Sequence, residues 1–293
     1  MGMNSLTRKF DLFYVAIVAV LSIWALLVLY PFYNALLVSV TPLKEYTLSP
    51  FLIYPKSITL SAYQYILSSG RIFVGYKTTL AILFLGLPYN MLLSVLTAYA
   101  LSKNKFPGKN GIIFFIIFTM FFNGGLIPLY LVVKTLGIMN TIWSVVLPYG
   151  INTFYMLIIK NYFETLPAEI EESAKIDGAG IFTTIFKIVL PLSTPIIATF
   201  VLFYAVDRWN EWFYPMLFLS KPNLIPLQVI LRNILVENQA ETLYAAGSSL
   251  RKEVYAKSIK MAAVVITMAP IMCVYPFLQR YFVKGLLLGA VKS

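Results

Sequence analysis

Long runs of apolar residues without any charge divide the chain into six segments. These runs are Leu12–Leu43, Thr78–Ser102, Asn110–Val133, Thr135–Ile159, Ile188–Val206 and Met261–Gln279. A hydrocarbon core about 30 Å thick needs about 20 helical residues, because each residue rises about 1.5 Å. All six runs are long enough, and they do not alternate in polarity as the strands of a membrane barrel do. Since hydrocarbon offers backbone groups no partners, each run is predicted to be a transmembrane helix.

The segments between these runs are less apolar. Residues 41–76 contain several prolines and a predicted short helix at 61–67, and residues 221–260 contain a predicted surface helix at 228–241. Two basic residues precede the first run, as in a signal peptide. That run is longer than the apolar core of a signal peptide, so we predict that it is retained as a span.

Composition places the chain among membrane proteins. Hydrophobic residues make up 59% of the chain and charged residues 12%, and the mean hydropathy is +0.79. Soluble domains normally carry about 25% charged residues, so this chain could not cover a water-facing surface. We therefore predict an all-α polytopic membrane protein with six transmembrane helices.

The net charge of +11 comes from 23 basic and 12 acidic residues that form no basic stripe. We attribute it to anionic lipid headgroups or an acidic partner, and not to nucleic acid. Counted over all connections, basic residues do not distinguish the two sides of the membrane. The short loop with Lys103, Lys105 and Lys109, together with Arg8 and Lys9, favours a cytoplasmic amino terminus.

Few residues suited to catalysis are present. Histidine is absent, which removes the commonest general base and most zinc sites. The single cysteine, Cys273, lies inside an apolar run and is interpreted as a small core or lipid-facing residue. No G-x-x-x-x-G-K-[ST] sequence occurs, and residues 107–110 lack its spacing. We predict no bound cofactor or metal and no enzymatic activity for this chain.

Residues 165–195 predict an exposed helical hairpin between the fourth and fifth runs. Pro167 and the three glutamates after it suit a helix start, because proline lacks an N–H and acids favour that end. Gly178 is a natural stop, and a second helix is predicted at 181–190. The residues alone leave two interpretations open, a docking element or a plain connecting loop.

The same segment resembles the signature of permease subunits in binding-protein-dependent ABC importers. That signature reads Glu-Ala-Ala, three residues, Gly, nine residues, and then Ile-x-Leu-Pro. The matching residues here are Glu172, Ser173, Ala174, Gly178, Ile188, Leu190 and Pro191. The spacing agrees throughout, and the one departure is Ser173 in place of alanine, a small-for-small change.

This resemblance implies a type I ABC importer permease fold with a coupling loop at 165–191. In that family the loop sits in a cleft of a separate ATPase subunit, so it is expected in the cytoplasm together with both termini. ATP and Mg are expected on the ATPase subunits. Glu169 is interpreted as a helix-start charge only. The residues expected at the ATPase contact are Glu171, Glu172, Ser173, Ala174, Asp177, Gly178, Ile188, Leu190 and Pro191.

Three further segments resemble the carbohydrate class, which includes the maltose and alginate-oligosaccharide importers. They are Trp209–Pro215, Phe122–Tyr130 and the tail Gly285–Ser293. The resemblance as a whole covers roughly residues 76–293. The domains it implies are residues 1–75 (amino-terminal tail, first span and outer loop), 76–281 (transmembrane domain) and 282–293 (cytoplasmic tail).

Polar and aromatic residues near the fourth and fifth runs are candidates for the solute pathway. Sugars are bound through amides, carboxylates and aromatic faces, and ionisable groups at membrane depth usually face an interior or water. Asp207 is expected to pair with Arg208 or with a partner permease. The alternative is an interfacial belt of aromatic residues and snorkelling charges. The candidates are Tyr149, Asn152, Tyr155, Asp207, Asn210, Glu211 and Trp212.

Together these features predict the permease subunit of an ATP-driven importer for an oligosaccharide or polysaccharide fragment, in the bacterial cytoplasmic (inner) membrane. Expected partners are a second, different permease, two ATPase subunits, an extracytoplasmic solute-binding protein, the sugar and the lipid bilayer. The outer stretches 41–76 and 221–260 are expected to face the binding protein. Two alternatives stay open: a permease for another solute such as a peptide, and a secondary transporter or channel.

Overall fold

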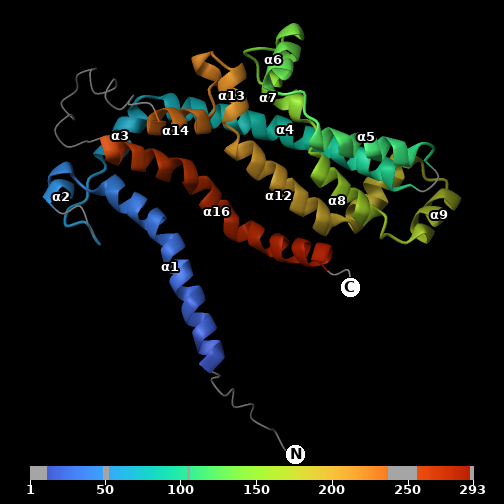
Figure 1. Cartoon of the computed structure of the whole chain (residues 1–293), viewed down its shortest axis with the longest axis horizontal. Helices are drawn as coiled ribbons and strands as arrows, with labels where there is room; N and C mark the ends of the chain where they lie inside the picture. Colours follow the sequence, from blue (N-terminus) through green and yellow to red (C-terminus); the bar gives the residue numbers. More distant parts are fainter. Residues whose placement is uncertain (1–11, 49–52, 104–105, 237–255, 291–293) are drawn as a thin grey trace, which may run out of the picture. The chain divides into compact units, whose positions relative to one another are not determined.

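The chain folds into helices joined by turns (Figure 1). The computed structural model describes residues 12–48, 53–103, 106–236 and 256–290. No strand occurs within these ranges, so the all-α prediction is confirmed. The helices belong to two units, one made of residues 1–69 and 237–266 and the other of residues 70–236 and 267–293.

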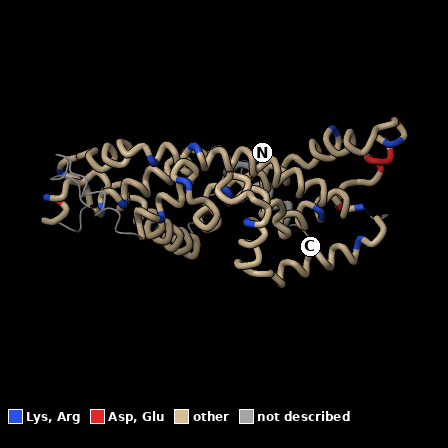
Figure 2. The backbone as a smooth tube through the Cα atoms, turned by 90° about the horizontal axis from the view of Figure 1, so that it is seen from above, with Lys and Arg blue, Asp and Glu red and all other residues tan. Residues whose placement is uncertain are grey.

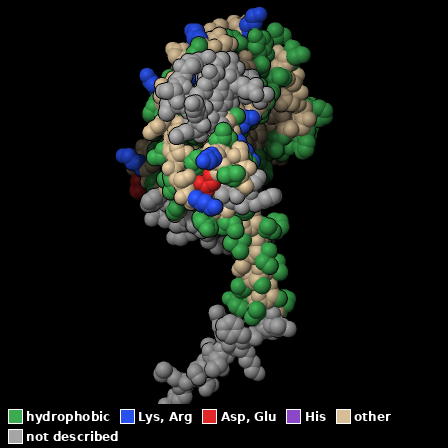
Figure 3. Space-filling view, turned by 90° about the vertical axis from the view of Figure 1, so that its left-hand side faces the viewer, with side chains coloured by type: hydrophobic (Ala, Val, Ile, Leu, Met, Phe, Trp, Pro, Cys, Tyr) green, Lys and Arg blue, Asp and Glu red, His purple; other side chains and the backbone are tan. Residues whose placement is uncertain are grey.

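Among its described residues, the first unit holds three helices and the beginning of a fourth. They are α1 (Leu12–Val40), α2 (Leu43–Leu48), α3 (Ser61–Ser68) and the start of α16 (Ala256–Ala290). The short helix predicted at 61–67 is confirmed as α3, and its Tyr63 hydroxyl lies 2.7 Å from the Ser39 hydroxyl at the end of α1. None of the apolar window of α1 is buried within this chain (0%). Figure 3 shows its hydrophobic side chains on every visible side, which suits a helix surrounded by lipid or a partner.

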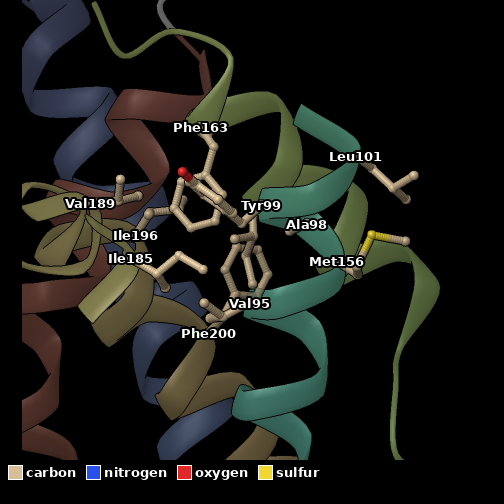
Figure 4. Packing of buried hydrophobic residues seen from close by; sticks show 11 residues of the cluster. Val95, Ala98, Tyr99, Leu101, Met156, Phe163, Ile185, Val189, Ile196 and Phe200 are labelled. Atoms are coloured by element: carbon tan, nitrogen blue, oxygen red, sulfur yellow. The ribbon is translucent and has the colours of Figure 1, made fainter. Parts of the chain in front are cut away.

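The second unit is built around α4 (Arg71–Ser102), which packs against α8 (Thr153–Phe163), α12 (Thr194–Asn210) and α14 (Leu227–Val236). Figure 4 shows the apolar core where α4, α8 and α12 meet. Its buried residues are Val95, Ala98, Tyr99, Leu101, Met156, Ile159, Phe163, Ile185, Val189, Ile196 and Phe200. This core fixes the ends of three helices that carry the residues described below.

Three described helices, α1, α4 and α16, are long and apolar enough to cross a membrane. Two bent helix pairs qualify if each pair counts as one span, which gives up to 5. One pair is α5 (Lys109–Phe121) with α6 (Leu126–Thr135), bent by 110°, and the other is Ile181–Leu192 with α12, bent by 89°. The count of six spans therefore stays a prediction.

The fourth apolar run, residues 135–159, is not the single helix that was predicted. It contains α7 (Trp143–Val146), the 3-10 turn η1 (Leu147–Tyr149) and then α8, which starts at Thr153. Pro148 lacks the N–H that a continuing helix would use. The Asn152 side chain accepts the Tyr155 N–H at 3.2 Å and so begins α8 afresh.

The third and fifth runs bend where glycine or proline interrupts them. Between α5 and α6, Gly125 has a φ of +90°, which favours glycine. In the fifth run, Pro191 and Pro195 flank the bend before α12. The run at 188–206 is thus divided between two helices instead of forming one.

The remaining elements of the described ranges are short. They are α9 (Ala168–Ile176), α10 (Ile181–Thr183), the π-helical η2 (Thr184–Val189), α11 (Leu190–Leu192), α13 (Phe213–Phe218) and η3 (Pro222–Leu224). The surface helix predicted at 228–241 corresponds to α14 as far as Val236. Its remainder, the basic residues Arg8, Lys9 and Lys105, and the last residues of the tail lie outside the described residues. The predicted domain limits stay predictions.

Candidate functional site

The hairpin predicted at 165–195 is present, and Gly178 ends its first helix. Gly178 has a φ of +78°, and its N–H donates to the Lys175 carbonyl at 3.0 Å. The Ala179 N–H donates to the Ala174 carbonyl at 2.9 Å. These two bonds satisfy carbonyls that the end of α9 would leave without partners, so the predicted glycine stop is confirmed.

Ion pairs connect the base of this hairpin to the loop after α4. Glu171 on α9 pairs with Lys103, and Glu164 accepts from the ammonium groups of Lys109 and Lys160 at 2.8 Å each. Burial raises the pKa of the Glu164 carboxyl, but the two lysine hydrogen bonds outweigh it, so this pKa lies below its ordinary value. Figure 2 shows basic and acidic residues side by side at the end of the second unit that carries α9.

The residues predicted to contact an ATPase differ in exposure. Ala174 is only 6% exposed, so its small side chain faces this chain and not an outer surface. Glu171 is half-buried in its ion pair. Ile188 and Leu190 are also half-buried, whereas the exposed members are Glu172, Ser173, Asp177, Gly178 and Pro191.

Sequence reasoning missed Ile176, an exposed apolar residue at the tip of the hairpin. Its side chain is 86% exposed. The available signal was a single apolar residue next to Asp177 at the end of a polar helix. An exposed isoleucine there offers a partner an apolar contact between charged neighbours.

A polar cavity of about 420 Å³ lies beside the break in the fourth apolar run. Its walls come from α4, η1, the segment before α8, and the end of α12 with the residues after it. The lining residues are Asn90, Tyr149, Ile151, Asn152, Tyr204, Asp207, Arg208, Asn210, Glu211 and Trp212. All the predicted pathway residues except Tyr155 are among them. The hydroxyl of Tyr155 donates to Asp207 Oδ2 at 3.0 Å, so Tyr155 supports the cavity from behind.

The two carboxylates of the cavity form no ion pair with any side chain in the described part of the chain. Asp207 accepts from the Tyr155 hydroxyl, and the expected pair with Arg208 is not formed. Glu211 Oε1 accepts the N–H groups of Phe213 and Tyr214 at 3.0 and 3.3 Å, at the start of α13. Each carboxylate therefore keeps an oxygen for which the structure gives no partner.

Arg208 is buried in the cavity wall, with 6% of its surface exposed. Its Nε donates to Asn90 Oδ1 at 2.9 Å, and Nη1 donates to the Val145 carbonyl at 2.9 Å. Its Nη2 donates to the carbonyls of Val146 and Tyr149 at 3.2 and 3.0 Å. Asn90 in turn donates to the Tyr149 carbonyl and, at 2.9 Å, to that of Gly150. A guanidinium and an amide thus bind the main chain where the fourth run breaks.

Four lining residues were not predicted as pathway residues, namely Arg208, described above, and Asn90, Ile151 and Tyr204. Asn90 is the one amide in the second apolar run, which was a usable signal. Tyr204 gave none, yet its hydroxyl accepts the Asn152 N–H at 2.9 Å and lies 2.7 Å from the Ser94 hydroxyl. Ile151 supplies an apolar surface. In the described part of the chain no group of three or more His, Cys, Asp or Glu residues is placed to hold a metal.

Comparison with known proteins matches this fold to membrane transport. The permease protein YtcP of the polygalacturonan/rhamnogalacturonan transport system of Bacillus subtilis (strain 168) is 39% identical over 97% of this chain and 100% of its own. Protein LplC of the same organism is 42% identical over 83% of this chain and 82% of its own.

A solved structure agrees over nearly the whole chain. It is a crystal structure of a bacterial ABC transporter involved in the import of the acidic polysaccharide alginate, with a TM-score of 0.84 and 31% sequence identity. The match covers 96% of this chain and 100% of the other. The family profile described as "binding-protein-dependent transport system inner membrane component" matches residues 3–287. The chain therefore belongs to the family of binding-protein-dependent transport system inner membrane components, which are multi-pass membrane permeases.

Proposed function

We propose that this chain is the permease subunit of an ATP-driven importer that moves an oligosaccharide or polysaccharide fragment into the cytoplasm by alternating access. The observation that carries the proposal is the polar cavity of about 420 Å³ beside the broken fourth run. The relative described as a polygalacturonan/rhamnogalacturonan transport system permease and the similar ABC transporter involved in alginate import support a carbohydrate as the solute.

The cavity has the chemistry that a sugar requires. The free oxygens of Asp207 and Glu211 can accept hydrogen bonds from sugar hydroxyls, and the amide of Asn152 can bind further hydroxyls. Trp212 is exposed in the lining and offers an aromatic face to the C–H groups of a sugar ring. Polar groups at membrane depth are costly, so their gathering around one cavity favours a role in transport.

The hairpin after α8 is proposed to couple this cavity to ATP hydrolysis. Its exposed residues Glu172, Ile176 and Asp177 would enter a cleft of a separate ATPase subunit. Two such subunits would bind ATP and Mg, and their closure would push the hairpin and reorient α8 and α12. This chain would supply movement and a pathway, and the ATPases would supply the reaction.

This assignment fixes a proposed topology. With the hairpin in the cytoplasm of a bacterial cell, both termini lie there too, as the basic residues of the first loop also favour. Residues 41–76 and 221–260 would then face an extracytoplasmic solute-binding protein. The exposed apolar surface of α1 would lie against lipid or a second, different permease.

Reconstitution tests the proposal directly. The complete transporter, with its second permease, ATPases and binding protein, is placed in proteoliposomes and offered neutral oligosaccharides, acidic oligosaccharides or peptides. We expect ATP-dependent uptake of one carbohydrate class. Uptake of peptides alone would contradict the sugar assignment, and uptake that needs an ion gradient but no ATP would contradict the importer itself.

A pair of tryptophan variants tests the cavity. Trp212→Ala removes the aromatic face from the lining, whereas Trp143→Ala removes an exposed tryptophan that does not line the cavity. Loss of a stacking contact should raise the sugar concentration for half-maximal uptake about tenfold in the first variant only. Equal behaviour of the two variants would place the sugar elsewhere.

A further inference from the structure

We propose that Arg208 and Asn90 form a carbonyl clamp, a pair of side chains that holds the main-chain oxygens of residues 145–150 and so positions the cavity wall for the solute. The inference deepens the proposed function, because it assigns a positioning role at the same cavity. It rests on the geometry of one buried guanidinium and one buried amide. Neither residue is a catalytic or coupling residue in this view.

The broken fourth run creates the need for such a clamp. A helix that ends leaves its last carbonyls without partners, and α7 with η1 ends at Tyr149. Val145 and Val146 are fully buried, so bulk water does not reach their carbonyls, and buried carbonyls need donors from the protein. Arg208 supplies donors to the carbonyls of Val145, Val146 and Tyr149, and the Asn90 amide supplies donors to those of Tyr149 and Gly150.

The guanidinium of Arg208 donates to main-chain carbonyls and not to a carboxylate. The neighbouring carboxylates Asp207 and Glu211 take other donors, and no ion pair of Arg208 occurs among the described residues. A planar guanidinium suits this task, because its fixed fork of N–H groups reaches several oxygens at once. A lysine at the same position carries all its donors on one nitrogen, so it could not reach the same set of oxygens.

The surrounding helices leave room for this pair. A Cβ added to Gly86 on α4 would lie 3.0 Å from Nε of Arg208. A Cβ on Gly150, whose carbonyl the clamp holds, would lie 2.8 Å from the side chain of Leu93 and 2.9 Å from that of Tyr89. Both glycines let the backbone and the guanidinium approach closely, so the local sequence is consistent with a built clamp.

The clamp and the solute cavity share residues. Arg208, Asn90 and Tyr149 all line the cavity, and Asn152, which starts α8, follows the clamped segment directly. Holding the carbonyls of residues 145–150 therefore fixes where the side chains of Tyr149 and Asn152 face. Loosening the clamp should change both the order of this segment and the apparent affinity for the solute.

The first experiment measures the order of the clamped segment by cysteine protection. Val146→Cys is placed in a Cys273→Ser background of the complete transporter, because the Val146 side chain is fully buried and cysteine is a similarly small apolar residue. We expect Arg208→Lys to speed maleimide labelling of this cysteine about tenfold, the factor that one lost hydrogen bond of about 1.4 kcal/mol gives. Arg71→Lys, a change at an exposed arginine, should leave it protected.

The second experiment measures function in the same variants. Arg208→Lys should raise the sugar concentration that half-maximally stimulates ATP hydrolysis about tenfold while the maximal rate stays unchanged. If Arg208→Lys does not assemble, the same two measurements, maleimide labelling and sugar-stimulated ATP hydrolysis, are made on Asn90→Ala, which keeps the cation and removes the amide. A cysteine that stays protected overturns the clamp. Faster labelling with an unchanged sugar concentration for half-maximal ATP hydrolysis overturns the positioning role. A wild-type transporter that imports no sugar contradicts the proposed function but does not change the meaning of the labelling result.

Discussion

The base of the hairpin and the wall of the cavity both concentrate charge in the second unit, but they treat it in opposite ways. At the hairpin, Glu171 and Glu164 meet lysines in ion pairs that remain partly exposed. In the cavity wall, Arg208 is buried and binds carbonyl oxygens, while Asp207 and Glu211 form no ion pair with the described residues. The base of the hairpin neutralises its glutamates with lysines, whereas the cavity wall leaves an oxygen of Asp207 and of Glu211 able to accept a hydrogen bond from a solute.

The difference follows from access to water. Near water an ion pair replaces hydration that is equally good, so its net contribution is small, about 0 to 1 kcal/mol. In a buried wall, a main-chain oxygen that loses its donor cannot hydrogen-bond to bulk water instead, so each lost donor costs about 1 to 3 kcal/mol. Four variants test this contrast, and we order them by the size of the expected effect.

The largest effect is expected for Arg208→Met. The variant leaves the carbonyls of Val145, Val146 and Tyr149 without these donors, and we expect a loss of at least about 3 kcal/mol of stability. Thermal denaturation of the detergent-purified transporter measures it. Arg71→Met is the control at an exposed arginine. An equal, small loss of stability in both variants would show that the buried hydrogen bonds of Arg208 contribute no more than a surface charge does.

The next effect is expected for Gly178→Ala at the hairpin. Alanine at a φ of +78° costs about 1 kcal/mol, although a Cβ there would meet nothing within 4 Å. Gly180 has a φ of −71° and equally free space, so Gly180→Ala is a matched control. Sugar-stimulated ATP hydrolysis should fall in the first variant and not in the second. A similar fall in both would mean that the left-handed turn is not what couples the hairpin.

These two regions also differ in how well the sequence predicted them. The glycine stop of α9 depends on a local conformation that residue type reveals, so Gly178 was placed correctly. The clamp was not predicted, because Arg208 binds main-chain oxygens, and every residue carries one whatever its side chain. From adjacent charges we expected Asp207 to pair with Arg208 or with a partner permease; the pair with Arg208 is not formed, and the pair with a partner stays a prediction.

The breaks in the apolar runs show a second limit. Hydropathy averages over about 20 residues, so residues 135–159 appear as one span even though the helix stops at Tyr149 and restarts at Thr153. The clue was Pro148 with Gly150, since such residues interrupt helices. Six of the seven predicted pathway residues line one cavity, and their role in a solute pathway stays a prediction; they stood out because amides, acids and tryptophan within or next to long apolar runs are uncommon.

A smaller effect is expected for Glu171→Gln on α9. It removes the ion pair with Lys103, which lies partly in solvent, so stability should fall by no more than about 1 kcal/mol. The loss should shrink at high salt, because screening already weakens the pair in the wild type. Glu169→Gln, an exposed glutamate of the same helix, is the control. A loss of several kcal/mol would show that the hairpin base behaves like the buried wall.

The smallest effect is a pH dependence at Glu164. Its pKa lies below the ordinary glutamate value because Lys109 and Lys160 both donate to it. A carboxyl with a lowered folded-state pKa stabilises the protein above its unfolded value of about 4.3, and this stability is lost as the pH falls through the folded-state pKa. Comparing the unfolding temperatures of wild type and Glu164→Gln from neutral pH downward should therefore show an advantage of the wild type that is constant at first and vanishes in acid. An advantage that instead grew as the pH fell would mean that the lysines do not hold the Glu164 carboxylate, and that the hairpin base is not neutralised as its contacts indicate.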